Sequence, residues 1–175
     1  SPISWNEERC INCGACLNEC PVYELVGPVF GYKYMGGLGL VFTAFHAGLE
    51  KSFEGGLYLC TLCGRCRAVC PVEINIPELV ERMRARAASK GLILPPHREM
   101  ASFILEKGNA LGLDASQRFR APGHDGESPN LYYVGCVASL RYKRVAEAAS
   151  RILERMGYPF RVLGEGEVCC GDPLY

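Results

Sequence analysis

The sequence has no net charge, few histidines and no nucleotide-binding fingerprint. Its 175 residues include 19 basic and 19 acidic side chains, which gives no overall positive field for holding a nucleic-acid backbone. No Gly-x-Gly-x-x-Gly loop of the dinucleotide-binding type occurs. The histidines, His46, His97 and His124, are scattered, and no Ser–His–acid group or carboxylate pair stands out. We therefore predict no catalytic residue and no nucleic-acid partner.

Signs of secretion are also missing. The N-terminus has no signal-peptide pattern, and the 11 cysteines are an odd number, which argues against a closed disulfide framework. We therefore expect a cytoplasmic protein, and the start at Ser1-Pro2 without Met predicts a processed chain or a fragment. Hydrophobic residues at 49% and charged residues at 22% are typical of a globular protein with one domain or two small ones.

Cysteine is the abundant residue, and eight of the 11 cysteines lie in two runs of identical spacing. Each run reads C-x2-C-x2-C-x3-C-P with Gly after the second Cys, over residues 10–21 and again over residues 60–71. This run is typical of proteins with [4Fe–4S] clusters, in which the fourth Cys binds the cluster of the other run. Three thiolates two residues apart can bind three corners of a cubane, and Gly14 and Gly64 let the backbone come close.

Two [4Fe–4S] clusters with crossed ligands are therefore predicted. The first cluster is expected to bind Cys10, Cys13, Cys16 and Cys70. The second cluster is expected to bind Cys60, Cys63, Cys66 and Cys20. Zinc and disulfide bonds are the alternatives. Zinc would need paired C-x2-C units and would leave the third Cys without a role, and disulfides would suit a secreted chain.

The spacing between the runs points to a particular family. Compact bacterial ferredoxins join the runs by a short hairpin, whereas 39 residues separate Cys20 from Cys60 here. Residues 1–95 resemble instead the alpha-helical ferredoxin domain of succinate dehydrogenase iron–sulfur subunits, lactate-utilisation proteins and heterodisulfide reductase subunits. Residues 10–23, CINCGACLNECPVY, are especially similar to the lactate-utilisation group.

Within the spacer, Val26–Leu49 is apolar and approaches the length of a membrane span. Its first half is rich in Gly, which predicts a poor helix. We therefore expect a loop followed by a helix over Leu38–Lys51, packed over the clusters. A spanning helix and a surface contact with a membrane or a quinone are the alternatives.

After the second run, Asn75-Ile-Pro-Glu78 has the residues of a helix start, which predicts a helix to Lys90 that ends at Gly91. Arg82 and Arg86 share one face of this helix with Lys90. That face is either solvated or a docking site for an acidic electron-transfer partner.

The rest of the chain predicts a different kind of domain. Residues 96–130 are expected to form a helix, about residues 97–111, and a linker rich in Gly, Pro and Ser. Two short β-type runs, residues 131–134 and 159–163, then flank a helical pattern over residues 140–156. Strand, helix and strand in this order suggest a parallel βαβ unit.

Residues 131–175 resemble the first part of a cysteine-rich CCG domain. The family pattern is one Cys, a long gap, Cys-Cys-Gly and a later Cys-x-x-Cys. Here 32 residues separate Cys136 from Cys169-Cys170-Gly171, and no closing Cys-x-x-Cys follows. The resemblance implies an incomplete metal site at Cys136, Cys169 and Cys170, which would hold a third cluster or zinc only in a longer chain. The alternative is that these cysteines are structural or free.

The predicted fold class is mainly α: an alpha-helical ferredoxin domain with two [4Fe–4S] clusters, followed by a partial α/β CCG domain. This layout resembles heterodisulfide reductase-like subunits, and it implies an electron-transfer subunit of an oxidoreductase complex. Single electrons would pass between a flavin-type partner and a CCG, quinone or disulfide site. The implied partners are a flavoprotein subunit and, as a further option, a membrane- or quinone-linked subunit through which the protein would associate with a membrane. Two alternatives stay open: a non-redox module with structural clusters, and a catalytic disulfide or quinone reductase that needs further C-terminal residues.

Overall fold

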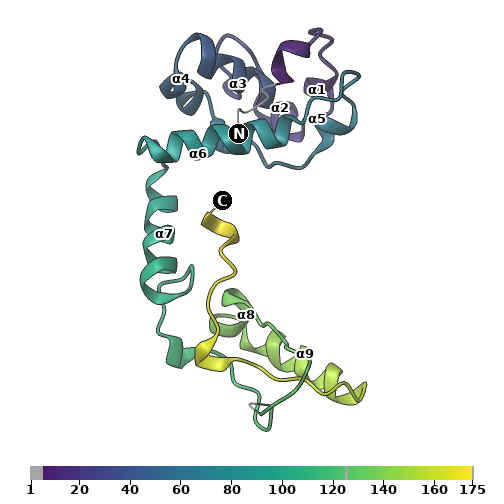
Figure 1. Cartoon of the computed structure of the whole chain (residues 1–175), viewed down its shortest axis with the longest axis vertical. Coiled ribbons are helices and arrows are strands. Elements are labelled where there is room, and N and C mark those ends of the chain that lie inside the picture. Colours follow the sequence, from purple (N-terminus) through teal and green to yellow (C-terminus); the bar gives the residue numbers. More distant parts are fainter. Residues whose placement is uncertain (1–5, 125, 175) are drawn as a thin grey trace. The chain divides into compact units, whose positions relative to one another are not determined.

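A computed structural model of the chain describes residues 6–124 and 126–174 (Figure 1). The described residues are mainly helical and divide into two compact units, one that ends at Ile93 and one that starts at Leu94. Each unit has its own buried hydrophobic cluster.

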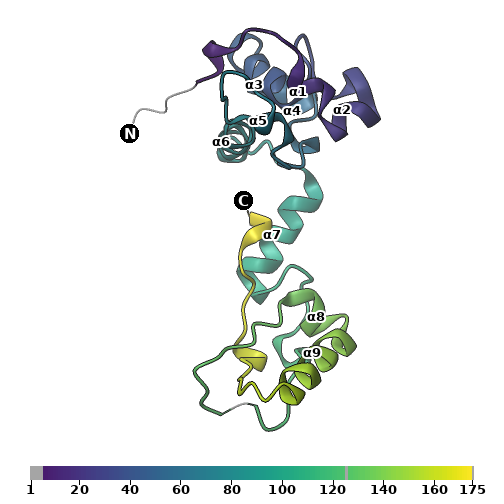
Figure 2. The ribbon, with the colours of Figure 1, turned by 90° about the vertical axis from the view of Figure 1, so that its right-hand side faces the viewer.

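The first unit is built from short helices around one longer helix. Its α-helices in the described residues are α1 (Ala15–Asn18), α2 (Pro21–Val26), α3 (Gly36–His46), α4 (Leu49–Glu54), α5 (Arg65–Ala68) and α6 (Ile76–Ser89). Short 3₁₀ turns are η1 (Asn6–Arg9), η2 (Gly27–Val29) and η3 (Leu57–Leu59). Figure 2 looks along the axis of α6. The core lies where α3, α4 and α6 pack against one another.

Helix α6 matches the expected helix because its apolar residues recur on one face. The buried members of this face are Ile76, Leu79, Val80, Met83 and Ala87. Burial of each larger side chain contributes about 1.5–3 kcal/mol to stability. Asn75 is the N-cap residue, but its side chain accepts no hydrogen bond from the helix backbone; its amide instead donates to Glu78 Oε2 (2.7 Å). Gly91, at φ 77°, follows the helix end.

The glycine-rich segment is helical earlier than expected. Helix α3 already begins at Gly36, because its glycines bring it close to neighbouring segments. A Cβ at Gly39 would lie 2.4 Å from the Tyr34 carbonyl carbon, and one at Gly37 would lie 3.2 Å from Cγ2 of Ile76. The expected single helix over Leu38–Lys51 is also divided, since Gly48 adopts φ 98° between α3 and α4. None of the helices in the described part of the chain is long and apolar enough to cross a membrane.

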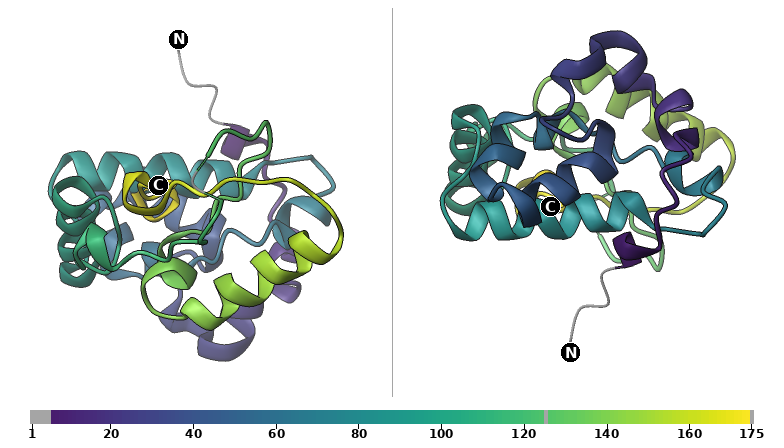
Figure 3. Two further views of the ribbon diagram at one scale, coloured as in Figure 1. Left: turned by 90° about the horizontal axis from the view of Figure 1, so that it is seen from below. Right: turned by 90° about the horizontal axis from the view of Figure 1, so that it is seen from above.

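The second unit contains three α-helices in its described residues and long irregular segments. The helices are α7 (Pro95–Lys107), α8 (Cys136–Leu140) and α9 (Lys143–Arg155), with 3₁₀ turns η4 (Ala115–Gln117), η5 (Gly164–Gly166) and η6 (Asp172–Leu174). Helix α7 begins two residues earlier than expected, because Pro95 and Pro96 form its first turn, where no backbone N–H is needed. Figure 3 shows α9 as the long helix that precedes the C-terminal segment.

Regular strands of the expected βαβ unit are not found in the described residues. The two segments run parallel beside α9 but share a single bridge, between Leu131 and Arg161. Tyr132 N–H donates to the Arg161 carbonyl oxygen (2.9 Å). The ladder goes no further because neighbouring backbone groups bond elsewhere. Val134 N–H donates to a Glu167 carboxylate oxygen (2.8 Å), and Val162 N–H donates to the His124 carbonyl oxygen (2.9 Å).

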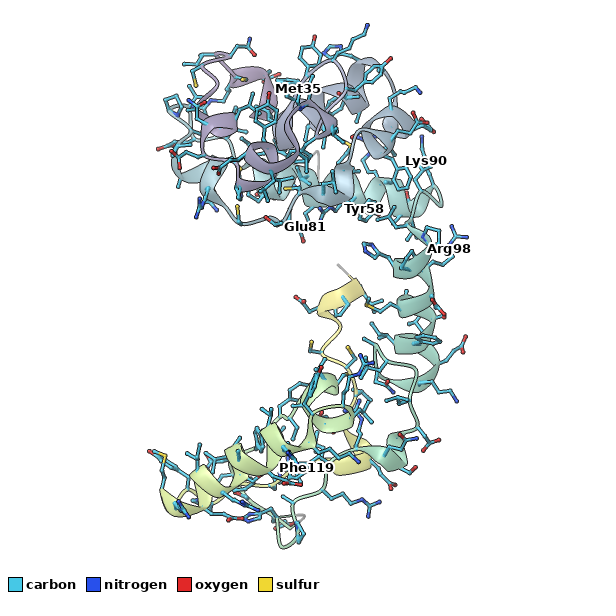
Figure 4. The ribbon with its side chains drawn as sticks, turned by 180° about the vertical axis from the view of Figure 1, so that it is seen from behind. Met35, Tyr58, Glu81, Lys90, Arg98 and Phe119 are labelled. Carbon is cyan, nitrogen blue, oxygen red and sulfur yellow. The ribbon has the colours of Figure 1, made fainter. Side chains whose placement is uncertain are left out.

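The segment expected as a linker packs into the second unit. Phe119 and Ala121 belong to its buried cluster together with Ala146 of α9 (Figure 4). His124 stacks on the Phe160 ring at a centroid distance of 4.1 Å. Phe119 N–H also donates to the Ser139 carbonyl oxygen (2.9 Å), which fixes this segment against α8. This segment is rich in Gly, Pro and polar residues, and its composition therefore did not indicate that it contributes to the core.

Candidate functional site

The two cysteine runs adopt the same backbone shape. In each run the second residue after the first Cys has a positive φ, 55° at Asn12 and 54° at Leu62. The glycines after the second Cys also match, with φ of 75° at Gly14 and 81° at Gly64. Positive φ is uncommon for Leu, so its presence at the matching place indicates a functional constraint on the loop. Loops of this kind turn backbone N–H groups into a concavity that suits anionic sulfur.

The two matching glycines are required by conformation. A Cβ at Gly14 or at Gly64 would meet no protein atom within 4 Å. Their positive φ values are those that only Gly adopts without strain. Close approach between protein atoms is therefore not the reason for Gly at these two positions.

The third and fourth cysteines are placed by helices. Cys16 lies in α1 and Cys66 in α5, and these two helices contact each other. Cys20 is the N-cap of α2, and its sulfur accepts a hydrogen bond from Tyr23 N–H (3.4 Å). Cys70 has the corresponding place in the second run, where its sulfur accepts from Ile74 N–H (3.3 Å). Each fourth cysteine therefore accepts a hydrogen bond from a backbone N–H that follows it in the chain.

Cysteines of different runs lie together. Cys20, from the first run, lines the same cavity as three cysteines of the second run, Cys60, Cys63 and Cys66. Cys16 also borders this cavity, whose walls include apolar residues such as Phe30 and Ile76.

The pKa shifts of the thiols report the same neighbours. Burial raises the pKa of Cys16, and the nearby thiols of Cys10, Cys13 and Cys70 raise it further. Burial is the main cause that raises the pKa of Cys66 to about 12, and the thiol of Cys60 raises it further. Thiolates gathered in this way need a cationic partner to be stable, which a metal centre supplies.

The pKa of Cys63, the exposed cysteine of the second run, shifts in the opposite direction. A hydrogen bond from Arg65 N–H is the main cause that lowers the pKa of Cys63. Cys13 and Cys63 are exposed, and the other six cysteines of the two runs are half-buried. Each run therefore presents its second sulfur to solvent.

A mononuclear metal site is not formed by these residues. Among the described residues, no three His, Cys, Asp or Glu side chains are arranged to hold a single ion. A tetrahedral zinc ion would need its four sulfurs within about 4 Å of one another, since each Zn–S bond is about 2.3 Å. In a cubane each thiolate binds a different iron, so its ligands lie farther apart. All 11 cysteines are also free of disulfide bonds, and the arrangement therefore fits clusters better than either alternative.

The second unit brings its three cysteines together. Cys136 begins α8, and a hydrogen bond joins its side chain to that of Cys169. Burial raises the pKa of Cys169, and Cys136 and Cys170 contribute as neighbours. Backbone contacts hold the Cys-Cys pair, since Cys169 N–H donates to the Gly108 carbonyl oxygen (2.7 Å).

A buried ion pair lies directly behind these cysteines. Arg118 Nη1 donates to Glu167 Oε1 (2.9 Å), and both side chains are almost completely buried, at 0% and 1% exposure. Arg118 Nη2 donates to the Gly108 carbonyl oxygen (3.0 Å) and to the sulfur of Cys136 (3.8 Å). Glu167 accepts from the Gly135 N–H (3.0 Å) just before Cys136. The pair thereby connects both parts of the cysteine motif.

Sequence reasoning missed both members of this pair. Arg118 stands in a stretch of turn-forming residues, where an arginine is usually solvated. The nearness of Glu167 to Cys169 in the sequence was the one available signal. Of the scattered histidines, His124 contacts Phe160 and Glu154, which belong to the packing of the second unit and not to its cysteine site.

Comparison with protein families gives two matches. The family described as "4Fe-4S dicluster domain" matches residues 7–74. The family described as "Cysteine-rich domain" matches residues 130–175. The first match includes both cysteine runs, and the second includes Cys136 and the Cys169-Cys170 pair.

Three curated relatives are similar to the chain. One subunit of the fumarate reductase (CoM/CoB) of Methanothermobacter marburgensis is 32% identical over 171 residues, which are 94% of this chain and 35% of the relative. One subunit of the dihydromethanophenazine:CoB–CoM heterodisulfide reductase of Methanosarcina acetivorans is 31% identical over 191 aligned residues, covering 95% of this chain and 46% of the relative. Lactate utilization protein B of Lysinibacillus sphaericus is 43% identical over 125 residues, 71% of this chain and 22% of the relative.

The chain therefore spans less than half the length of these relatives. The first two alignments extend across both units. Together with the family matches, they show that the chain combines a 4Fe-4S dicluster domain with a cysteine-rich CCG domain, and that it is homologous to these subunits of heterodisulfide reductase and of fumarate reductase (CoM/CoB).

Proposed function

We propose that the first unit holds two [4Fe–4S] clusters with crossed ligands and relays single electrons to or from the cysteine-rich site. The observation that carries this proposal is the position of Cys20, which lines one cavity with three cysteines of the other run. The neighbours of Cys16 support the reciprocal exchange, because Cys70 acts on its thiol together with Cys10 and Cys13.

These neighbours support two ligand sets. Cys10, Cys13, Cys16 and Cys70 would hold the first cluster. Cys60, Cys63, Cys66 and Cys20 would hold the second. Clusters of this type exchange one electron at a time when bound. The chain's own contribution is to aim N–H groups at sulfur, as Tyr23 does for Cys20 and Ile74 for Cys70. Such hydrogen bonds adjust the potential by favouring the more negative, reduced state.

Relay is better supported than a purely structural role. Cys13 and Cys63 are exposed, so each cluster would have one ligand at the surface, where an electron can pass to another protein. A cluster that served only to hold the fold would gain nothing from this exposure. The shared cavity also implies that the two clusters are neighbours, as a relay requires.

The organisation of the whole protein is part of the proposal. Residues 1–95 would form the two-cluster domain, residues 96–130 would pack with the cysteine-rich domain that follows them, and residues 131–175 would contribute Cys136, Cys169 and Cys170 to a cysteine-rich site. The relatives are named as subunits of a heterodisulfide reductase and a fumarate reductase. We infer that this chain also acts within a reductase complex, with a flavoprotein as redox partner and with any membrane or quinone link supplied by another subunit.

Iron content and ligand exchange test the proposal. Anaerobically purified protein should carry about eight irons and about eight sulfides per chain, given two cubane clusters. Cys70→Ser should alter the EPR signal of the first cluster and leave that of the second unchanged, and Cys20→Ser should do the reverse. Zinc in place of iron in an iron-replete anaerobic preparation would refute the cluster assignment. If each serine variant affected only the cluster of its own run, the crossed pairing would be wrong.

A further inference from the structure

The two cysteine runs share a backbone shape but differ in charge. The second run contains Arg65 and Arg67 and no acidic residue. The first run contains Glu19 and no basic residue. Both arginines of the second run are exposed, so water and salt weaken their effect on a nearby cluster.

A third arginine is held much closer to the second run. Arg84 projects from α6 and donates through Nε and Nη2 to the Leu57 carbonyl oxygen, at 3.1 and 3.0 Å. Its Nη2 also donates to the carbonyl oxygen of Cys60, a proposed ligand of the second cluster. The guanidinium lies over the Tyr58 ring, 5.2 Å from its centroid. These contacts fix a half-buried positive charge at the backbone of one ligand.

The Arg84 guanidinium keeps its positive charge in these surroundings. Burial lowers the pKa of Arg84, while Cys60, Tyr58 and Glu81 act in the opposite direction. An arginine guanidinium stays protonated in proteins at neutral pH. Glu81 is the nearby carboxylate, and it is exposed on the same helix; Figure 4 labels it together with Tyr58. In the described residues Arg84 has no salt bridge.

A fixed positive charge raises the reduction potential of a nearby cluster. Reduction adds one negative charge, so a nearby cation stabilises the reduced form more than the oxidised form. The effect is strongest where water is partly excluded, as it is at half-buried Arg84.

We propose that Arg84 gives the second cluster the higher reduction potential, so that electrons run from the first cluster to the second. The inference rests on the proposed function, because it assumes two clusters and the assignment of Cys60 to the second. Arg84 is a positioning residue: it contacts a ligand's backbone and not the reacting atoms.

Redox titration followed by EPR tests this order. The signal of the second cluster is identified in a Cys63→Ser variant, and both midpoint potentials are then measured in the wild-type chain, in Arg84→Gln and in Arg82→Gln. Arg82 is the matched control, since it lies on α6 too but pairs with Glu78 at the surface. We expect Arg84→Gln to lower the potential of the second cluster alone by about 59 mV, a tenfold change in its reduction equilibrium. Arg82→Gln should leave both potentials unchanged. Arg84→Lys keeps the positive charge, so the potential of its second cluster should stay close to the wild-type value.

The outcomes separate this inference from the proposed function. A wild-type chain with fewer than two clusters would refute the proposed function. Two intact clusters with the first at the higher potential, or an Arg84→Gln variant in which both potentials fall equally or neither moves, would overturn the role of Arg84 alone. If Arg84→Gln fails to load its second cluster, Arg84→Met replaces it, because Met also removes the charge while filling similar space; a second-cluster potential equal to the wild-type value in that variant would overturn the role of Arg84.

Discussion

Replacing Glu167 by Gln should destabilise the second unit strongly. Glu167 accepts three hydrogen bonds: from Arg118 Nη1 (2.9 Å), from Gly135 N–H (3.0 Å) and from Val134 N–H (2.8 Å). Gln has nearly the same shape but only one acceptor oxygen, so at least one buried donor would face an amide N–H₂. It would also leave the Arg118 charge, whose side chain is fully buried, without a counter-charge. Breaking a buried ion pair by removal of one partner costs about 3–5 kcal/mol.

Hydrogen exchange can measure this loss within one unit of the chain. The amides of α9 are protected by the packing of Ala146 in the buried cluster, and a loss of about 3 kcal/mol should accelerate their exchange by more than a factor of about 100. If the loss exceeds the free energy of unfolding of the second unit, the α9 amides should be fully exchanged at the first time point measured. The same measurement on α6 should be unaffected, because that helix belongs to the other unit.

The chain offers a matched control from the same two segments. Arg120 pairs with Glu165, but the two side chains are 66% and 48% exposed. Glu165→Gln should therefore change stability by at most about 1 kcal/mol. The double variant Arg118→Met/Glu167→Gln removes both charges but keeps an amide oxygen for the backbone N–H groups, and it should be less damaging than Glu167→Gln alone. Equal effects of Glu167→Gln and Glu165→Gln on α9 exchange would refute the reasoning.

Two further predictions concern the cysteines. In iron-free protein at pH 8, iodoacetamide should label Cys63 well before Cys66, because the Arg65 N–H lowers the pKa of the exposed Cys63 thiol whereas burial raises that of Cys66 to about 12. Raising the pH through 9 towards 12 should narrow the difference in labelling rate, which mass spectrometry measures, and an unchanged ratio of the two labelling rates over this pH range would contradict the assignment. The chain should also hold no third cluster, because Cys136, Cys169 and Cys170 give one ligand fewer than a four-cysteine site needs; iron well above about eight per chain would show that this is wrong.

The parts of the fold that could be predicted depend on local rules. Cysteine spacing and the following proline fix the loops and identify the runs, and the dicluster family match agrees with that interpretation. Helix α6 was predictable because capping, apolar period and terminating glycine all agree. Helix α3 was only partly predictable, since the cost of Gly in a helix is local, whereas the close contact of Gly37 with Ile76 is made by a residue far along the chain.

The second unit was less predictable for a related reason. Its core includes Phe119 from a segment with turn-like composition, and its polar centre joins Arg118 to Glu167, 49 residues apart. The period of apolar residues identifies a helix or strand that buries one face. It gives no information about a single buried side chain in an irregular segment. The βαβ prediction failed at the same point: the carboxylate of Glu167 takes up the Val134 N–H that a strand would have used.

The two units therefore place their sulfur atoms by different physical means. In the first unit backbone conformation sets the loops, through positive φ at Leu62 and Gly64 and through N–H groups that bond to sulfur. Side chains between these cysteines can vary while the loop keeps its shape, as Arg65 and Arg67 of the second run show by standing where the first run has Ala15 and Leu17. In the second unit a buried side-chain pair holds Cys136 near Cys169, and it is built from charges that cannot change singly without large cost. Substitutions around the cysteines should hence adjust the potential in the first unit, whereas in the second they should disturb the assembly of the site itself.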